Sequence, residues 1–260
     1  MIKGILFDFD GTLSSENSIT FIMKWQIRRN FESENNFNPF YGILNLNRIF
    51  FYGFRYTRHL RNLFSKKNYE KPIDEIITEY GKYISKYYPY ILRSFKNISK
   101  ENLAKISKMI PLRPGVKELL LKIKEKGIKI GICSMSLEIA ALTALDFIKF
   151  DYIACNNLIY ERKHTAKSTG DSMLVVRNAE DKKKVILDFS KVFNFSLADI
   201  AFVGDDFHDI LAADAAGIGL ILYDLTKIDK NVGFFYKKAM DQYNFKIIYN
   251  ILDVKKYINL

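Results

Sequence analysis

Two short acidic segments of this chain contain the side chains best suited to chemistry. In the first, Asp8 and Asp10 follow directly after the apolar run from Ile2 to Phe7. Side chains two positions apart in extended backbone point the same way, so both carboxylates would enter one pocket. Like charges repel there, so their pKa values can be pushed apart. One carboxylate could then stay ionised as a nucleophile or metal ligand while the other handles a proton.

The residues after Asp10 could contribute to anion binding. Gly11 and Thr12 suit a tight turn that leaves backbone N–H groups exposed. The alternative is an ordinary solvated Asp-Gly turn at the end of a strand. Taken alone, this segment favours the chemical interpretation.

The second acidic segment runs from Gly204 to Asp209, after the apolar residues 200–203. Asp205 and Asp209 are four positions apart, so both could face one point across a strand-to-helix turn. Mg²⁺ prefers oxygen ligands, takes one or two carboxylates and keeps several waters. An acidic helix N-terminus also explains Asp206, because the helix dipole favours negative charge there. It explains Asp205 less well, since that residue should lie at the sheet edge.

A hydroxyl group could bind an anion beside these carboxylates. Ser134 follows the apolar run that ends at Cys133, and we expect Met135 and Ser136 to open a helix. The backbone N–H groups at a helix N-terminus have no partner within the helix, so they form a binding site for phosphate. A plain helix N-cap is the alternative, and without the other segments it would be the better interpretation.

A run of three lysines could supply the positive charge. Lys182, Lys183 and Lys184 begin a helix that leads to the fourth predicted strand. One lysine here could neutralise a phosphate and keep a nucleophile ionised, whereas most lysine triplets are solvated helix faces. Two of these three lysines are expected to lie on such a face.

Alternating strands and helices must position these residues. Short apolar runs predict buried parallel strands, separated by segments with helical spacing, which favours an α/β fold with a parallel sheet covered on both faces. The predicted strands cover residues 2–7, 128–133, 151–155, 200–203 and 217–222, and the predicted helices cover 114–127, 138–147, 181–193 and 209–216. Residues 156–177 read as irregular, with a hairpin as one option, and the tail after Asp224 gives no clear pattern.

The segment between the first two strands has a different composition. The chain of 260 residues has a net charge of +11, and residues 14–110 contain 17 basic and 8 acidic residues, a net of +9. Half of the 38 aromatic residues, 19, lie there as well. Apolar residues recur at helical spacing, which predicts about four helices. We therefore expect an α/β core over residues 1–14 and 111–260 and an α-helical cap over residues 15–110.

Several protein classes are excluded by composition. Two cysteines, Cys133 and Cys155, are too few to staple a chain of this length, so a disulfide-framed secreted protein is ruled out. The N-terminal apolar run stops at Asp8 and does not resemble a signal peptide. No window approaches the roughly 18 apolar residues of a membrane span, so we expect no transmembrane segment. These features predict a cytoplasmic location.

Taken together, the four segments resemble the four motifs of the haloacid dehalogenase (HAD) superfamily, in order and in position after strands. They are Asp8-Phe9-Asp10-Gly11-Thr12, Ser134, the Lys182 region and Gly204-Asp205-Asp206-Phe207-His208-Asp209. The resemblance covers residues 2 to about 222. A helical insert between the first two motifs is similar to the phosphoserine-phosphatase-like branch. The resemblance implies a doubly wound, Rossmann-like parallel sheet with an inserted all-α cap.

The resemblance also implies a function, namely a Mg²⁺-dependent phosphatase that hydrolyses a small phosphorylated metabolite through an aspartyl-phosphate. Asp8 would be the nucleophile, and Asp10 the general acid and then the base. The residues expected to bind the phosphoryl group are Ser134, Lys182, Gly11 and Thr12. Within the lysine run, the spacing of 23 residues before Asp205 favours Lys182 over Lys183 and Lys184. The residues expected to hold Mg²⁺ are Asp8, Asp10, Asp205 and Asp209. Covalent catalysis divides one difficult displacement into two easier ones, and charge neutralisation supplies most of what phosphoryl transfer needs.

The basic cap has three interpretations. It could be a solvated face, a lid that recognises an anionic group of the substrate, or a contact for nucleic acid or an anionic membrane. The substrate candidates in the cap are Glu16, Arg55 and Arg58, of which the two arginines share one helical stripe. Two other functions stay open: a phosphomutase of the same fold, and a non-catalytic protein that binds polyanions. The first two interpretations of the cap are favoured over the third.

Overall fold

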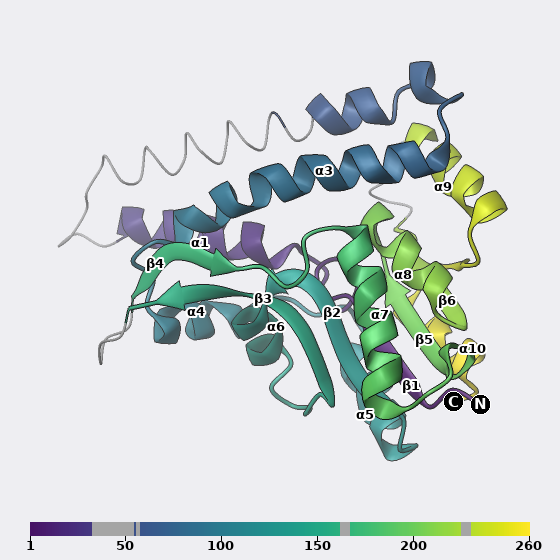
Figure 1. The fold of residues 1–260 in the computed structure, drawn as a ribbon. Coiled ribbons are helices and arrows are strands. Elements are labelled where there is room, and N and C mark those ends of the chain that lie inside the picture. Colours follow the sequence, from purple (N-terminus) through teal and green to yellow (C-terminus); the bar gives the residue numbers. More distant parts are fainter. Residues whose placement is uncertain (33–54, 56–57, 162–166, 225–229) are drawn as a thin grey trace.

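The computed structural model describes residues 1–32, 55, 58–161, 167–224 and 230–260 (Figure 1). The strands are β1 (Gly4–Phe7), β2 (Lys129–Leu137), β3 (Tyr152–Tyr160), β4 (Ser168–Met173), β5 (Ile200–Gly204), β6 (Ile218–Leu222) and β7 (Lys246–Ile248). The α-helices are α1 (Ser18–Glu32), α3 (Ile73–Leu92), α4 (Lys100–Ser107), α5 (Val116–Glu125), α6 (Glu138–Ala144), α7 (Ala179–Phe193), α8 (Ile210–Ala215), α9 (Lys230–Gln242) and α10 (Val254–Ile258). Short 3₁₀ turns are η1 (Lys66–Asn68), η2 (Arg93–Phe95), η3 (Leu197–Asp199), η4 (Phe207–Asp209) and η5 (Ile251–Asp253).

One sheet of seven strands forms the centre of the molecule, in the order β4-β3-β2-β1-β5-β6-β7. Every neighbouring pair is parallel except β3 and β4, which are antiparallel. β1 lies in the middle, with Phe7 in register with Ile132 of β2 and with Val203 of β5. All four residues of β1 are buried, as a strand covered on both faces requires. The α/β fold expected from the sequence is therefore confirmed.

Helices cover both faces of this sheet. Ile5 and Phe7 belong to one hydrophobic cluster, which includes buried residues of α5, α6 and α10. Leu6, between them in sequence, belongs to the other cluster, with residues of α7, α8 and α9. Alternation along the strand thus places successive side chains in two separate cores. This arrangement is the doubly wound architecture that the family resemblance implies.

Helices α1, α3, α4 and α5 come between β1 and β2 in the chain, and residues 58–63 are also helical. Figure 1 shows α3 as a long helix that lies across the sheet. Tyr88 and Leu92 of α3 share a hydrophobic cluster with Ile5 of the central strand. The packing between α3 and the central strand is continuous. The division into a core and a cap over residues 15–110 therefore stays a prediction from the sequence.

Two regions carry more regular structure than the sequence predicts. Residues 156–177 contain the end of β3 and the whole of β4, which form a hairpin. The buried Asn156 stabilises this hairpin, because its amide donates to the Val176 carbonyl at 2.7 Å and its oxygen accepts the Val176 N–H at 2.9 Å. The segment after Asp224 adds α9, β7 and α10, and β7 extends the sheet beside β6.

Two further expectations concern cysteines and membrane segments. Cys133 and Cys155 are both buried and free. Among the helices that the structure describes, none is long and apolar enough to cross a membrane.

Candidate active site

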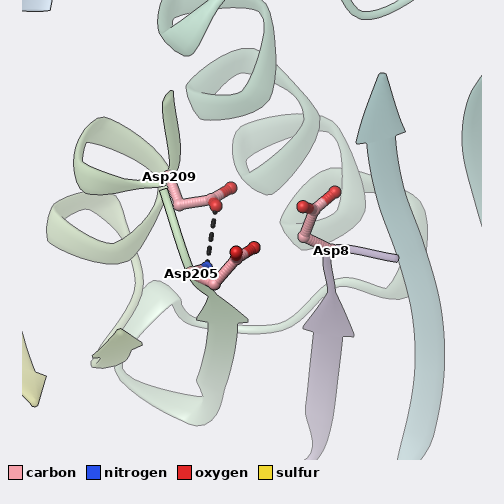
Figure 2. Close-up of side chains that lie close together, drawn as sticks. All are labelled: Asp8, Asp205 and Asp209. Atoms are coloured by element: carbon pink, nitrogen blue, oxygen red, sulfur yellow. Dashed lines mark hydrogen bonds between the residues drawn. The ribbon is translucent and has the colours of Figure 1, made fainter. Parts of the chain in front are cut away.

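The two acidic segments meet at the carboxyl ends of neighbouring strands. Asp8 follows β1, Asp205 follows β5, and the Asp8 N–H donates to the Val203 carbonyl at 2.8 Å. Figure 2 shows the carboxylates of Asp8, Asp205 and Asp209 around one space, with the first two at the tips of their strands. One oxygen of each lies within 4.8 Å of the others. The structure therefore brings together three of the four expected metal ligands.

Two glycines allow these carboxylates to approach the backbone. Gly11 has φ of +81°, and a Cβ there would lie 2.1 Å from Asp205 Oδ2. A Cβ at Gly204 would lie 2.2 Å from Asp209 Cγ. The hydroxyl of the buried Thr12 donates to Asp205 Oδ1 at 2.9 Å. Gly11 and Thr12 thus shape the pocket and orient Asp205.

Asp209 is fully buried and holds the second acidic turn together. Its Oδ2 accepts the N–H groups of Asp205 and Asp206, each at 3.0 Å, and Figure 2 draws the first of these bonds. Its Oδ1 accepts from Lys182 Nζ at 2.6 Å. Asp8, Asp10 and Asp205 line the cavity described below, whereas Asp209 does not. Asp209 therefore lies outside the cavity and positions Lys182 and the backbone of Asp205 through hydrogen bonds.

Lys182 of α7 is the lysine that reaches the cluster. Its side chain is 3% exposed, and Nζ lies 3.2 Å from Asp8 Oδ1. Burial alone would lower its pKa, but the carboxylates of Asp209 and Asp8 raise it well above the usual value. Lys184 instead has a side chain that is 68% exposed. Of the three lysines, the structure places Lys182 beside Asp8, as the spacing favours.

Asp10 is held at the N-terminus of α1. Its Oδ1 accepts the Ser18 N–H at 2.7 Å and its Oδ2 accepts from the Asn17 amide at 3.2 Å. Burial, and then the nearby Asp8 carboxylate, raise the pKa of Asp10 to about 7. Burial raises the pKa of Asp8 to about 6, although Lys182 opposes the shift. At neutral pH Asp8 is thus mostly ionised, while Asp10 can carry a proton.

Ser134 lies beside Asp8, but not at the start of a helix. The sequence predicts that Met135 and Ser136 open a helix, and this is wrong: β2 continues to Leu137, with a register shift after Cys133. The Met135 carbonyl is bonded by the hydroxyl of Tyr88 and by the amide of Asn156, which keeps the backbone extended. A hydrogen bond from Ser134 lowers the pKa of Asp8.

A cavity of about 610 Å³ lies above these residues. Its floor contains Asp8, Asp10, Ser134, Lys182 and Asp205. Its walls come mainly from α1 and α3, and include Ile19, Met23, Tyr83, Ile84, Tyr87, Tyr88 and Ile91. Helices α1 and α3 thus form the walls of the cavity above the candidate site residues.

The three cap candidates are not among the described residues that line this cavity. Glu16 is exposed and forms an ion pair with Lys24 at 3.6 Å. Arg55 and Arg58 are both exposed. Their contact with substrate stays a prediction.

A contact that the sequence does not suggest joins α3 to the second acidic turn. The hydroxyl of Tyr80, a buried residue of α3, donates to the Asp206 carboxylate at 2.7 Å. The Tyr80 ring lies 4.4 Å from the His208 ring. Burial would raise the pKa of Asp206, but hydrogen bonds from His208 and Tyr80 and the charge of His208 hold it below its usual value. No local pattern signals this contact, because its partners are 126 positions apart.

The donor set fits a hard divalent cation. Burial raises the pKa of Asp205 well above its usual value, and the charges of Asp8 and Asp209 raise it further. Lys182 neutralises part of this negative charge, and a divalent cation would neutralise more. Carboxylate oxygens are the ligands that Mg²⁺ selects.

Carboxylates at the ends of adjacent parallel strands, a buried lysine and a doubly wound sheet define an α/β protein whose site lies at the carboxyl edge of its sheet. The family model described as "Hydrolase: haloacid dehalogenase-like hydrolase" matches residues 2–217, and the chain belongs to this family. The resemblance seen in the four motifs is thereby confirmed.

Curated relatives match part of the chain. A phosphoserine phosphatase of Archaeoglobus fulgidus is 26% identical over 141 residues, which are 54% of this chain and 40% of the relative. A phosphoserine phosphatase of Methanocaldococcus jannaschii is 27% identical over 123 residues, 47% of this chain and 57% of the relative. The matched regions thus span about half the length of these relatives.

Solved structures share the whole fold. A phospho-aspartyl intermediate analogue of phosphoserine phosphatase has a TM-score of 0.63, with 99% of each chain covered and 19% identity. Cytosolic 5'-nucleotidase IIIB bound to cytidine has a TM-score of 0.62, with 98% of this chain and 83% of the other covered and 14% identity. These likenesses establish the fold of the chain.

Proposed function

We propose that this chain is a Mg²⁺-dependent phosphatase that hydrolyses a small phosphomonoester through an aspartyl-phosphate on Asp8. The observation that carries the proposal is the pairing of Asp8 with the buried Lys182, Nζ to Oδ1 3.2 Å, on the floor of a cavity that Asp10 also lines. Family membership and the names of the curated relatives support phosphate ester chemistry.

In the first step, the ionised Asp8 carboxylate attacks the phosphorus atom of the ester. The bond from phosphorus to the ester oxygen breaks, and Asp10 donates its proton to that oxygen, so that an alcohol leaves. The raised pKa values, about 6 for Asp8 and about 7 for Asp10, suit this division of roles. Lys182 and the Ser134 hydroxyl would bind the phosphoryl oxygens while the group is transferred from the ester oxygen to Asp8.

In the second step, the ionised Asp10 accepts a proton from a water molecule. The water oxygen attacks phosphorus, the bond from phosphorus to Asp8 breaks, and inorganic phosphate leaves, so that Asp8 is again a carboxylate and Asp10 again carries its proton. Asp8, Asp205 and the backbone carbonyl of Asp10 would hold Mg²⁺. The ion, when bound, supplies positive charge that stabilises the phosphoryl oxygens.

The test is turnover of a phosphate panel, including phosphoserine and a generic aryl phosphate, with and without Mg²⁺. We expect Asp8→Asn to abolish turnover, because an amide cannot act as the nucleophile. Asp188→Asn is the matched control, since that carboxylate is 58% exposed on α7. Turnover that survives Asp8→Asn would contradict the aspartyl-phosphate route, and a folded protein that hydrolyses no ester in the panel would contradict the function.

A further inference from the structure

The walls of the cavity differ in chemistry from its floor. Beyond the polar floor, α3 contributes Tyr83, Ile84, Tyr87, Tyr88 and Ile91, spaced as one helical stripe. On the facing side, α1 contributes the apolar residues Ile19 and Met23 beside the polar Thr20 and Lys24. A phosphate bound beside Asp8 would therefore direct its leaving group between the apolar and aromatic stripe of α3 and the partly apolar face of α1.

Few charged side chains in the described part of the chain line the cavity above its floor. Among the described lining residues, the acidic side chains Asp8, Asp10, Asp205 and Asp206 all come from the two acidic segments near the floor. Above the floor, the lining cation in the described part of the chain is Lys24, whose side chain is 69% exposed and lies 3.6 Å from Glu16. A charged leaving group would lose water here without gaining a buried ionic partner, which is costly.

Two of the tyrosine rings of this wall, Tyr83 and Tyr87, pack against neighbouring rings. Tyr83 stacks on His59 at 3.8 Å between centroids and lies 4.6 Å from Tyr87. The Tyr88 hydroxyl donates a hydrogen bond to the Met135 carbonyl. Recognition of a cation by aromatic rings requires it to sit over open ring faces. The wall formed by these rings suits a flat apolar group better.

We infer that the preferred substrate is a phosphomonoester whose alcohol carries a planar apolar ring, held between α1 and α3. This inference rests on the proposed phosphatase activity and names its substrate class. A ring that leaves water for this cavity gains the favourable free energy of apolar burial and contacts with the tyrosine edges and faces.

Phenethyl phosphate and ethyl phosphate test the inference, because their alcohols have nearly equal acidity and differ in the ring. With Mg²⁺, we expect kcat/KM for phenethyl phosphate to be about tenfold to hundredfold higher, as burial of an aromatic ring predicts. Equal values for the two esters, or a preference for phosphoserine, would overturn the inference while leaving the phosphatase activity intact.

A wall variant locates the ring. Tyr87→Ala should lower the ratio of the two kcat/KM values about threefold to tenfold, because part of the ring's contact surface is removed. Tyr249→Ala, at a residue that is 64% exposed, is the control and should leave the ratio unchanged. An unchanged ratio in Tyr87→Ala would show that the ring does not lie against α3, and would overturn the inference.

A binding measurement separates the inference from the proposed function. Calorimetry with the Asp8→Asn protein and Mg²⁺ would compare phenethyl phosphate, ethyl phosphate and phosphocholine. Tighter binding of phenethyl phosphate supports the inference even if the active protein hydrolyses neither ester, a result that would count against the phosphatase activity alone. Equal affinities, or tightest binding of phosphocholine, would overturn the inference.

Discussion

Lys182 balances the charge of the candidate site, since it lies between the carboxylates of Asp8 and Asp209. We predict that Lys182→Met lowers kcat/KM about hundredfold to thousandfold, because a group that stabilises the phosphoryl oxygens is lost. The variant should also be less stable by about 3–5 kcal/mol, because two buried carboxylates lose their partner. Steady-state kinetics and chemical denaturation measure the two effects.

The control for this prediction is Lys184→Met, two positions further along α7. Its side chain is 68% exposed and lies 3.9 Å from Asp181. Surface pairs of this kind contribute about 0–1 kcal/mol, so stability and kinetics should both stay near those of the unchanged protein. Equal losses in the two variants would show that the position of the lysine is irrelevant.

A second prediction concerns Gly11, where a side chain would have two effects. It would strain the backbone, which has a positive φ, and it would collide with the Asp205 carboxylate. Gly11→Ala places a Cβ against Asp205 at a residue with positive φ, whereas Gly127 has φ of +72° and nothing within 4 Å of its Cβ position. Both alanine variants should lose about 1–2 kcal/mol of stability through backbone strain. Gly11→Ala should in addition weaken Mg²⁺-dependent activity.

Titration of activity with Mg²⁺ checks this difference. The Mg²⁺ concentration for half-maximal activity should rise in Gly11→Ala, because Asp205 is displaced, and stay constant in Gly127→Ala. If both variants respond alike to Mg²⁺, then Asp205 does not hold the cation in the way proposed.

At the scale of elements, α3 links the two hydrophobic clusters and reaches the second acidic turn. Its residues Ile73 and Tyr80 pack in one cluster, and Tyr88 and Leu92 pack in the other. We predict that Tyr80→Phe destabilises the protein by about 1–2 kcal/mol, because a partly buried hydrogen bond to the charged Asp206 is lost. Thermal unfolding measures the loss.

Tyr249→Phe is the control for this hydroxyl deletion, since Tyr249 is 64% exposed. Its unfolding temperature should be nearly unchanged. A Tyr80→Phe protein as stable as this control would indicate that α3 is held by apolar packing alone.

The sequence predicts the strand-end residues well because each of them depends on local order. Asp8 and Asp205 follow short apolar runs that are typical of buried strands, and adjacent parallel strands bring their ends together. The length of β2 is missed, because the side chains that hold the Met135 carbonyl, Tyr88 and Asn156, are 47 and 21 positions away. A short hydroxyl-rich segment after a strand has the same composition as a helix N-cap.

The hairpin of β3 and β4 also could not be predicted from local sequence, because residues from elsewhere in the chain hold it in place. The Asn97 N–H donates to the Ser168 carbonyl at 2.8 Å, and the Ser168 N–H donates to the Ile98 carbonyl at 2.9 Å. Thr169, Gly170 and Asp171 are turn formers in isolation, yet they lie in β4. Partners from a distant segment, and not local preference, make this stretch a strand.

At the scale of the whole molecule, the charge of the chain and the charge of the site have opposite signs. The chain has a net charge of +11, with +9 of it between residues 14 and 110, whereas the floor of the cavity gathers Asp8, Asp10 and Asp205 around Lys182. An excess of buried negative charge opposes folding. The global stability of the metal-free protein should therefore depend on the protonation of this site.

The direction of that dependence follows from the raised pKa values. Asp8 and Asp10 have pKa values of about 6 and about 7, above the ordinary 3.8, so the folded state binds protons more tightly than the unfolded state. Their contribution to stability is complete below about pH 4 and is lost as pH rises through 6 and 7. Each pH unit between the ordinary and the raised pKa corresponds to about 1.4 kcal/mol.

We therefore predict that, with EDTA, the contribution of these two groups lowers Tm as the pH rises from about 4 to about 7 and levels off above that, and that Asp10→Asn makes this decline smaller. Mg²⁺ competes with protons for the carboxylates, so it should raise Tm more at pH 8 than at pH 5. Differential scanning calorimetry at both pH values, with EDTA and then with Mg²⁺, measures both effects. An equal rise in Tm at the two pH values would mean that the cation does not bind where these protons do, and Asp8 would lose its place among the ligands.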